Sequence, residues 1–192
     1  MANPELKTTS YVVLGMLSIG SRSGYEIRAS TALSLKNFWA LSPVQIYPEL
    51  KRLEQARLIR GRDEPRGGRP RRLFEVTAAG ERALAQWLRD LEELGDFEWR
   101  DLGLLKLFFA DALAPDEVLE HVAALRNRAE YYVRGLDREI IPAGQKTRER
   151  HGKRYPVVVA EFARDFHAWM AAWCDRFEAE VKAERRSRRA SR

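Results

Sequence analysis

Arginines gather in one short segment of the chain, at positions 60, 62, 66, 69, 71 and 72. Only Asp63 and Glu64 oppose these six, so the segment has a local net charge of +4. Gly67 and Gly68 lie at its centre. Guanidinium groups make paired hydrogen bonds to phosphates and fit narrow minor grooves, and glycine allows a backbone to approach closely. The composition therefore predicts contact with a nucleic-acid backbone, although the segment alone is equally compatible with a solvated basic loop.

A helix that could present polar side chains to the same ligand begins at Ser42. Ser42 and Gln45 have the three-residue spacing of a capping box, and Pro43 suits the first helical position, where its missing N–H costs nothing. Pro48 lies inside the expected helix and removes a backbone hydrogen bond, so we expect a kink or a loosened first turn there.

This helix is predicted to have a buried face and an exposed face. The buried face is formed by Ile46, Leu50 and Leu53, which follow at spacings of four and three. The exposed face carries the candidate DNA contacts: Gln45 for base reading, and Ser42, Lys51 and Arg52 toward the backbone. Glutamine can pair with adenine through two hydrogen bonds, while lysine and arginine neutralise phosphates. Two alternatives stay open: Gln45 could serve only its capping box, and Tyr47 could contact a phosphate or fill the interface with the preceding helix.

The arginine segment that follows fits a β-hairpin. Residues 58–62 and 71–76 each suit a short strand, and the stretch from Pro65 to Pro70 supplies turn residues. The predicted contacts of this wing are Arg66, Arg69 and Arg71, with Gly67 at the tip. A basic hairpin directly after a polar helix is typical of winged DNA-binding domains, which favours the phosphate interpretation over the solvated loop.

Three further helices complete this part of the chain. Apolar spacings and capping residues predict them from about Glu5 to Ser18, from Ser23 or Gly24 to about Leu33, and from Thr77 to about Leu94. Gly95 ends the last of these helices, and we place a domain boundary there. Residues 1–95 are therefore predicted to form a winged helix-turn-helix DNA-binding domain.

The order of motifs resembles the PadR family of transcriptional regulators. Tyr-Pro-x-Leu-x-x-Leu-Glu stands at residues 47–54, Gly-Arg-Pro at 68–70, Thr-x-x-Gly at 77–80 and Ser-Gly-Tyr-Glu-Ile at 23–27. Phe74 departs from the tyrosine that the family often has, which removes one hydroxyl group. The resemblance implies a DNA-binding regulator with a C-terminal helical dimerisation domain, and in many members a response to phenolic or other aromatic compounds.

Residues 96–192 are predicted to form that helical dimerisation domain, ending in a basic tail. A helix from about Trp99 to Phe109 has apolar residues on two faces and should be covered on both sides. A second helix starts at Pro115, and residues 142–144 end it. Its apolar residues recur at spacings of four and three, which is the seam of a helix packed lengthwise on another.

The end of the chain combines a polar segment, an aromatic helix and the tail. Residues 145–155 are expected to be a mobile loop, and a last helix begins at Pro156 with an aromatic stripe along it. The tail from Lys182 holds six basic residues and one acidic residue, for which a solvated, disordered end is favoured over contact with DNA. The seam and the stripe offer more apolar surface than one small unit buries, so we expect a homodimer.

Six aromatic residues in this part could line a pocket for a small aromatic effector: Trp99, Tyr131, Tyr132, Phe166, Trp169 and Trp173. Aromatic residues at helical spacing more often form a core, because each of them buries a large apolar area. Both interpretations stay open for this set.

The composition also argues against several functions. The 192 residues carry a net charge of +6 and a single cysteine, Cys174, so an intrachain disulfide is excluded and a reducing compartment is favoured. We find no bilayer-spanning apolar run and no secretory signal, and expect a cytoplasmic protein without membrane contact. The three histidines and Cys174 are too scattered for a metal site. Because no catalytic or phosphate-binding motif is found, we expect no enzyme activity and no cofactor.

These observations predict a mainly α-helical protein with one small β-hairpin, built from a winged helix-turn-helix domain and a C-terminal α-helical dimerisation domain. The expected function is sequence-specific binding to a pseudo-palindromic double-stranded DNA operator, most simply as a repressor that a small aromatic effector releases. The alternative is an effector-binding or protein-interaction dimer whose winged domain does not bind DNA specifically.

Overall fold

The computed structural model describes residues 6–34, 39, 43–64, 71–91 and 99–190. Contacts divide the chain into two compact units. Residues 1–95 together with 147–153 make the winged unit, and residues 96–146 together with 154–192 make the helical unit. The predicted boundary at Gly95 lies outside the described residues and stays a prediction.

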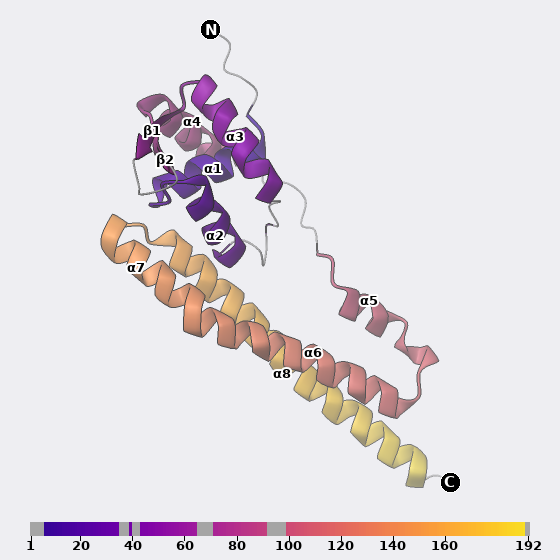
Figure 1. Cartoon of the computed structure of the whole chain (residues 1–192). Coiled ribbons are helices and arrows are strands. Elements are labelled where there is room, and N and C mark those ends of the chain that lie inside the picture. The colour runs from indigo at the N-terminus through magenta and orange to yellow at the C-terminus, as the bar shows by residue number, and fades with distance from the viewer. Residues whose placement is uncertain (1–5, 35–38, 40–42, 65–70, 92–98, 191–192) are drawn as a thin grey trace. The chain divides into compact units, whose positions relative to one another are not determined.

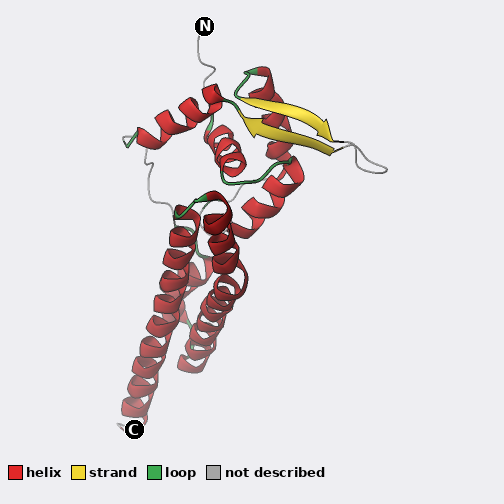
Figure 2. Ribbon diagram, turned by 90° about the vertical axis from the view of Figure 1, so that its left-hand side faces the viewer, coloured by secondary structure: helices red, strands yellow, loops and turns green. Residues whose placement is uncertain are grey.

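The winged unit consists of helices around one antiparallel hairpin, which Figure 2 shows in yellow. Its elements are α1 (Thr8–Ser18), α2 (Gly24–Ser34), α3 (Pro43–Gln55), β1 (Ile59–Glu64), β2 (Arg71–Val76) and α4 (Ala78–Arg89). The strands pair in a register that joins Ile59 to Val76 and Glu64 to Arg71. The mainly helical fold with one small hairpin is thus confirmed, and α3 runs through Pro48 as one continuous helix.

One apolar core holds the winged unit together. Leu14 of α1, Ile27 of α2 and Ile46 of α3 are fully buried in it, and Phe74 of β2 packs on the same cluster. Leu50 and Leu53 are buried as well, so the predicted inner face of α3 is confirmed. This burial fixes which side of α3 can meet a ligand.

Two tight junctions connect the hairpin to its flanking helices. After α3, Arg57 adopts a left-handed backbone conformation with φ of 59°, which turns the chain into β1. Thr77 caps α4 by accepting the Gly80 N–H at 3.2 Å, while its hydroxyl donates to the Arg57 carbonyl at 2.8 Å. A β-carbon at Gly80 would lie 2.1 Å from the Leu58 carbonyl oxygen, so only glycine fits there.

Helix α4 is shorter than the sequence predicts. It ends at Arg89, where Asp90 turns to an extended conformation, and not at about Leu94. Leu88 and Leu91, two apolar residues near the end of the predicted helix, are both mostly exposed. Neither side chain is buried on the core, so the apolar spacing that predicted further helical turns is not supported by tertiary packing.

The helical unit is a long two-helix hairpin with a short helix beside it. Its elements are α5 (Leu102–Phe108), a 3₁₀ turn η1 (Ala110–Ala112), α6 (Pro115–Gly135), a π-helical turn η2 (Leu136–Ile140), the first part of α7 (Ile141–His151), up to residue 146, and α8 (Tyr155–Ala190). Helices α6 and α8 lie side by side (Figure 1). The predicted seam on α6 is confirmed, because Val122, Leu125, Ala129 and Leu136 are buried.

The predicted end of the second helix at residues 142–144 is wrong. Helix α6 continues through η2 into α7, in which Ile141 donates its N–H to the carbonyl of Leu136, five residues earlier. Pro142 follows directly after this wider turn, where the α-helical hydrogen-bond ladder is already interrupted, so its missing N–H is accommodated within the continuous helix. Most of the segment expected to be a mobile loop, residues 145–155, is therefore helical.

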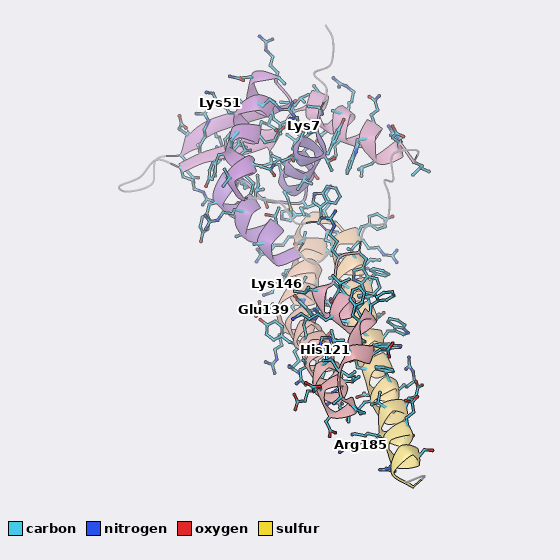
Figure 3. The ribbon with its side chains drawn as sticks, turned by 90° about the vertical axis from the view of Figure 1, so that its right-hand side faces the viewer. Lys7, Lys51, His121, Glu139, Lys146 and Arg185 are labelled. Carbon is cyan, nitrogen blue, oxygen red and sulfur yellow. The ribbon has the colours of Figure 1, made fainter. Side chains whose placement is uncertain are left out.

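The disordered tail is also wrong, because α8 extends to Ala190. Lys182 pairs with Glu178 one turn earlier, and Arg185 pairs with Asp116 in the first turn of α6. Figure 3 labels Arg185 near the C-terminal end of α8. These ion pairs connect the basic end to acidic partners that charge counting along the sequence does not reveal.

Helix α5 was predicted to be covered on both sides, but the structure covers only one of them. It contains no buried residue, and the outward face formed by Leu102, Leu105 and Phe108 is more than half exposed. Only its inner residues, Leu104 and Leu107, pack on the cluster around Val122. Among the residues that the structure describes, none buries this outward face.

Candidate nucleic-acid interface

Helix α3 presents a polar face opposite its buried one. Gln45, Tyr47 and Lys51 are exposed on this helix, as predicted for residues that meet a ligand. Figure 3 labels Lys51 at the surface of the winged unit. Ile46, Leu50 and Leu53 anchor the helix from behind, so the exposed side chains stand on a fixed support.

Tyr47 fills the interface with α2, which is one of the two roles that the sequence left open, and its contact with a phosphate stays a prediction. Its ring packs on α2 so closely that a β-carbon at Gly24 would lie 2.7 Å from Tyr47 Cε1. At the same time 57% of the residue is exposed. Tyr47 therefore fills the junction between α2 and α3 and still offers its outer edge to a ligand.

Arg52 is held within the protein. Its Nη2 lies 2.9 Å from Glu49 Oε1, and the same nitrogen donates to the hydroxyl of Ser10 on α1. Glu49 and Ser10 are both buried. These contacts tie α3 to α1, and a phosphate contact by Arg52 would compete with them.

The wing arginines fall into two groups. Arg60 and Arg62 are exposed on β1, and both lie close to Glu75 of β2, with nitrogen–oxygen distances of 3.5 and 4.0 Å. Arg71 and Arg72, by contrast, pair with Glu26 of α2 and Glu54 of α3. The hydrogen bond and the charge of Glu54 raise the pKa of Arg72 above its ordinary value. Part of the basic charge counted in the sequence is thus balanced by carboxylates of the domain itself.

Four predicted contacts lie outside the described residues: Ser42, Arg66, Gly67 and Arg69. Gln45, Tyr47 and Lys51 are brought together on one helix, and Arg71 lies on the hairpin that follows. All nine stay predicted DNA contacts.

Two exposed apolar side chains near these residues were not predicted. Val44 of α3 is 79% exposed, and Tyr25 of α2 is 69% exposed. Val44 stands two positions before the buried Ile46, a spacing that places it off the inner face of a helix, so helical periodicity could have identified it. An apolar side chain at such a position suits contact with a thymine methyl group.

The predicted effector set of the helical unit forms ring contacts at the surface. Trp99 meets Phe166 edge-on with ring centroids 5.4 Å apart, and Trp169 lies 6.3 Å from Phe166. Tyr131 contacts Tyr132, which stacks on His167 at 4.6 Å. Burial of His167 and the nearby Arg128 lower its pKa.

Trp173, the last of the set, lies apart from these rings. It stacks on Phe177 and packs on the core around Val122. The structure therefore joins five of the six residues through ring contacts, while Trp173 belongs to the packing between α6 and α8.

Other site types receive no support from the described part of the chain. Within those residues, no group of three or more His, Cys, Asp or Glu side chains could hold a metal ion. In the same residues, no helix is both long enough and apolar enough to cross a membrane.

Two family models match the chain, one in each part. Residues 13–86 match the transcriptional regulator PadR-like family, and residues 99–182 match the virulence activator alpha C-terminal family. The first match contains α3 and the hairpin, and the second contains the helices from α5 to most of α8.

Known proteins extend these matches. The negative transcriptional regulator PadR of Bacillus subtilis is 30% identical over 113 residues, which are 58% of this chain and 62% of that protein. The alignment thus spans less than two thirds of the relative. The crystal structure of Bacillus subtilis PadR in complex with operator DNA aligns with a TM-score of 0.76 and 22% identity, covering 91% of this chain and 99% of that one. The crystal structure of the same protein in complex with p-coumaric acid aligns with a TM-score of 0.69 and 21% identity, covering 92% of this chain and 99% of that one.

The matches agree with the geometry of the interface. The structural alignments show a shared fold over nearly the whole chain, and the first family model covers the helix and hairpin that carry the candidate contacts. With this arrangement of α3 and its wing, residues 13–86 match the transcriptional regulator PadR-like family, and the chain has the fold of Bacillus subtilis PadR.

Proposed function

We propose that the chain is a homodimeric, sequence-specific DNA-binding repressor, which a small aromatic ligand releases from its operator. The observation that carries the proposal is the two-sided helix α3, whose apolar face is buried while Gln45, Tyr47 and Lys51 are exposed. A helix anchored in this way can lie in a major groove with its side chains against base edges. Its cytoplasmic location follows from the same proposal, because the ligand is DNA.

The chemistry of each side chain indicates whether it contacts a base or a phosphate. Gln45 is proposed to read a base, because its amide can pair with adenine through two hydrogen bonds. Lys51 and the wing residues Arg66 and Arg69 are proposed to contact phosphates, which position the protein without reading sequence. Arg52 is a weaker candidate than the sequence implied, since Glu49 and Ser10 hold it.

Homodimerisation is supported by the exposed apolar surface of the helical unit. Phe162 and Trp169 of α8 are 71% and 54% exposed, and α5 presents a further apolar face. Exposed large apolar residues gathered on neighbouring helices mark a candidate interface. Two-fold symmetry then places the two α3 helices roughly 34 Å apart on successive major grooves, which implies a pseudo-palindromic operator.

Repression and release are the parts of the proposal that relatives support. The Bacillus subtilis relative is a negative regulator, and its structures include one with operator DNA and one with p-coumaric acid. In this chain, the surface rings around Phe166 are the candidate ligand contacts. A ligand bound there would act by binding one placement of the two winged units better than another.

The test is fluorescence anisotropy with DNA taken from upstream of the chain's own gene, against a scrambled duplex at two salt concentrations. Specific binding should exceed binding to the scrambled duplex by about 10³ or more. Gln45→Ala should relax the preference at one base pair at a cost of about 1–3 kcal/mol, whereas Gln86→Ala, an exposed glutamine of α4, should change nothing. Arg69→Ala should weaken binding to every sequence and lower the salt slope by about one.

The outcome also separates the alternative function. If the protein binds all duplexes in a genomic fragment pool equally and weakly, the interaction-dimer interpretation replaces the repressor. If binding is specific, p-coumaric acid can be titrated into the complex, and the proposed ligand class predicts a fall in anisotropy. Benzoate without the phenol group serves as the matched control ligand.

A further inference from the structure

Arg71 and Arg72 fix the hairpin to both helices of the helix-turn-helix. They are consecutive residues of β2, so their side chains leave opposite faces of the strand. Arg71 pairs with Glu26 of α2 and donates from Nη2 to Ser23 Oγ at 3.1 Å. Arg72 reaches the other way and donates from Nη2 to Glu54 Oε1 of α3 at 2.8 Å. The strand is thereby held between α2 and α3.

Glu54 is the centre of the contact with α3. Besides Arg72, its Oε1 accepts the backbone N–H of Gly61 on β1 at 3.0 Å. A β-carbon at Gly61 would lie 2.5 Å from this oxygen and 2.7 Å from Arg72 Nε. Glycine is therefore required for the close approach, and one carboxylate of α3 contacts both strands of the wing.

Arg72 also links the strands to each other. Its Nη1 donates to Asp63 Oδ1 of β1 at 3.0 Å, so one guanidinium holds two carboxylates at once. The planar fork of arginine reaches the two carboxylates from separate nitrogens held at fixed positions, whereas a lysine ammonium is one compact group that cannot occupy both positions. Glu54 and Asp63 each take one N–H of the fork, so a phosphate at Arg72 would share the guanidinium with two carboxylates that repel it.

We propose that Glu54 and Arg72 are positioning residues that fix the angle of the wing to α3, with Arg71 holding the opposite face of the wing on α2. The inference rests on the proposed DNA-binding function. Specific binding needs α3 and the wing to meet the duplex together, and a wing already held at the right angle loses less freedom on binding. Arg71 then acts through the geometry of the wing and not as a direct phosphate contact.

The decisive variants keep charge or shape constant. Arg72→Lys preserves the positive charge but loses the fork, and Glu54→Gln preserves an oxygen acceptor for Gly61 but loses the charge. Arg60→Lys is the matched control, because Arg60 lies on the same hairpin, is highly exposed and has one distant partner in Glu75. Partly exposed ion pairs contribute little to folding, so thermal unfolding should confirm that all three variants fold.

Binding should separate positioning from phosphate contact. We expect Arg72→Lys and Glu54→Gln each to lower the preference for the selected duplex over a scrambled one by about tenfold, and the double variant to lower it no further. Arg72→Lys should leave the affinity for scrambled DNA and its salt slope unchanged, and Arg60→Lys should leave all three quantities unchanged. If Arg72→Lys keeps the full preference, or if Arg72→Met lowers the salt slope by about one on both duplexes, the inference is overturned.

A measurement without DNA distinguishes this inference from the proposed function. The Gly61 amide should exchange about fivefold faster in Glu54→Ala and in Arg72→Lys than in the wild-type protein, but not in Arg60→Lys. Equal exchange in all four proteins overturns the positioning role. A wild-type protein that prefers no duplex while its Gly61 amide is protected overturns the proposed function and leaves the wing contact established.

Discussion

Phe162 offers the sharpest test of dimerisation. It lies on α8 with 71% of its surface exposed, on the same face as Val159 and Trp169, which are 40% and 54% exposed. The spacings of three and seven residues are those of a seam between lengthwise-packed helices. We predict that Phe162→Asp converts the dimer to a folded monomer.

The size of the effect follows from the exposed area. A buried phenylalanine removes roughly 200 Å² from water, so the exposed part corresponds to about 140 Å² and, at about 25 cal/mol per Å², to about 3.5 kcal/mol. A two-fold symmetric dimer buries two copies of Phe162, so the upper limit for the lost free energy of dimerisation is about 7 kcal/mol. If only half of this free energy is lost in the variant, the dimer dissociation constant still rises at least about 10²-fold. Burying a new carboxylate adds to the loss.

Sedimentation equilibrium over a concentration series measures the change directly. Tyr25→Asp is the control, because Tyr25 is equally exposed, at 69%, but lies on α2 of the winged unit. Circular dichroism should show the same helix content in both variants. A Phe162→Asp protein that dimerises over the same concentrations as the wild type would show that this face is not the interface, and the dimerisation argument would be wrong.

Three further predictions concern folding. Gly80→Ala should lower the free energy of unfolding by about 3 kcal/mol or prevent folding, measured by urea denaturation, because its methyl group would collide with the Leu58 carbonyl. Arg57→Gly should raise the melting temperature slightly, since glycine adopts a positive φ without steric cost. Burial disfavours the charge of Asp101, but hydrogen bonds from Arg128 and two backbone N–H groups outweigh this and lower its pKa. Its contribution to stability is therefore present above pH about 4 and lost as pH falls further. In Asp101→Asn, the free energy of unfolding measured by urea denaturation should fall less steeply below that pH than in the wild-type protein.

The winged unit was largely predictable because its signals are local. Ser42, Pro43 and the spacing of Ile46, Leu50 and Leu53 predict a helix with a known inner face, and Ile46 and Leu53 are fully buried as expected. Strand residues on either side of a glycine turn predict the hairpin in the same way. These features depend on neighbours a few positions away, which a single sequence displays directly.

Charge partners were less predictable, because they come from distant parts of the chain. Counting charges over residues 60–72 makes every arginine look available for phosphate. Arg71 and Arg72 instead meet Glu26 and Glu54, which lie 45 and 18 residues earlier. The sequence contains those carboxylates, but only the packing of α2 and α3 against the hairpin brings them to the strand.

Helix α8 shows why periodicity alone did not locate its partner. The sequence left open whether the aromatic stripe forms a core, and the buried positions of α8 are smaller residues. Cys174 packs on Val122 and Leu125 of α6, while Val157 and Ala160 pack on Leu136 of η2 and Ile141 of α7. A 3.5-residue repeat predicts a seam without saying which neighbour covers it, and this helix carries two such seams on different faces. One is covered within the chain by α6. The other carries the exposed Phe162 and Trp169. Because exposed apolar residues gathered on one face mark an interface, a 36-residue helix with two seams is best explained as the element that joins two copies of the chain.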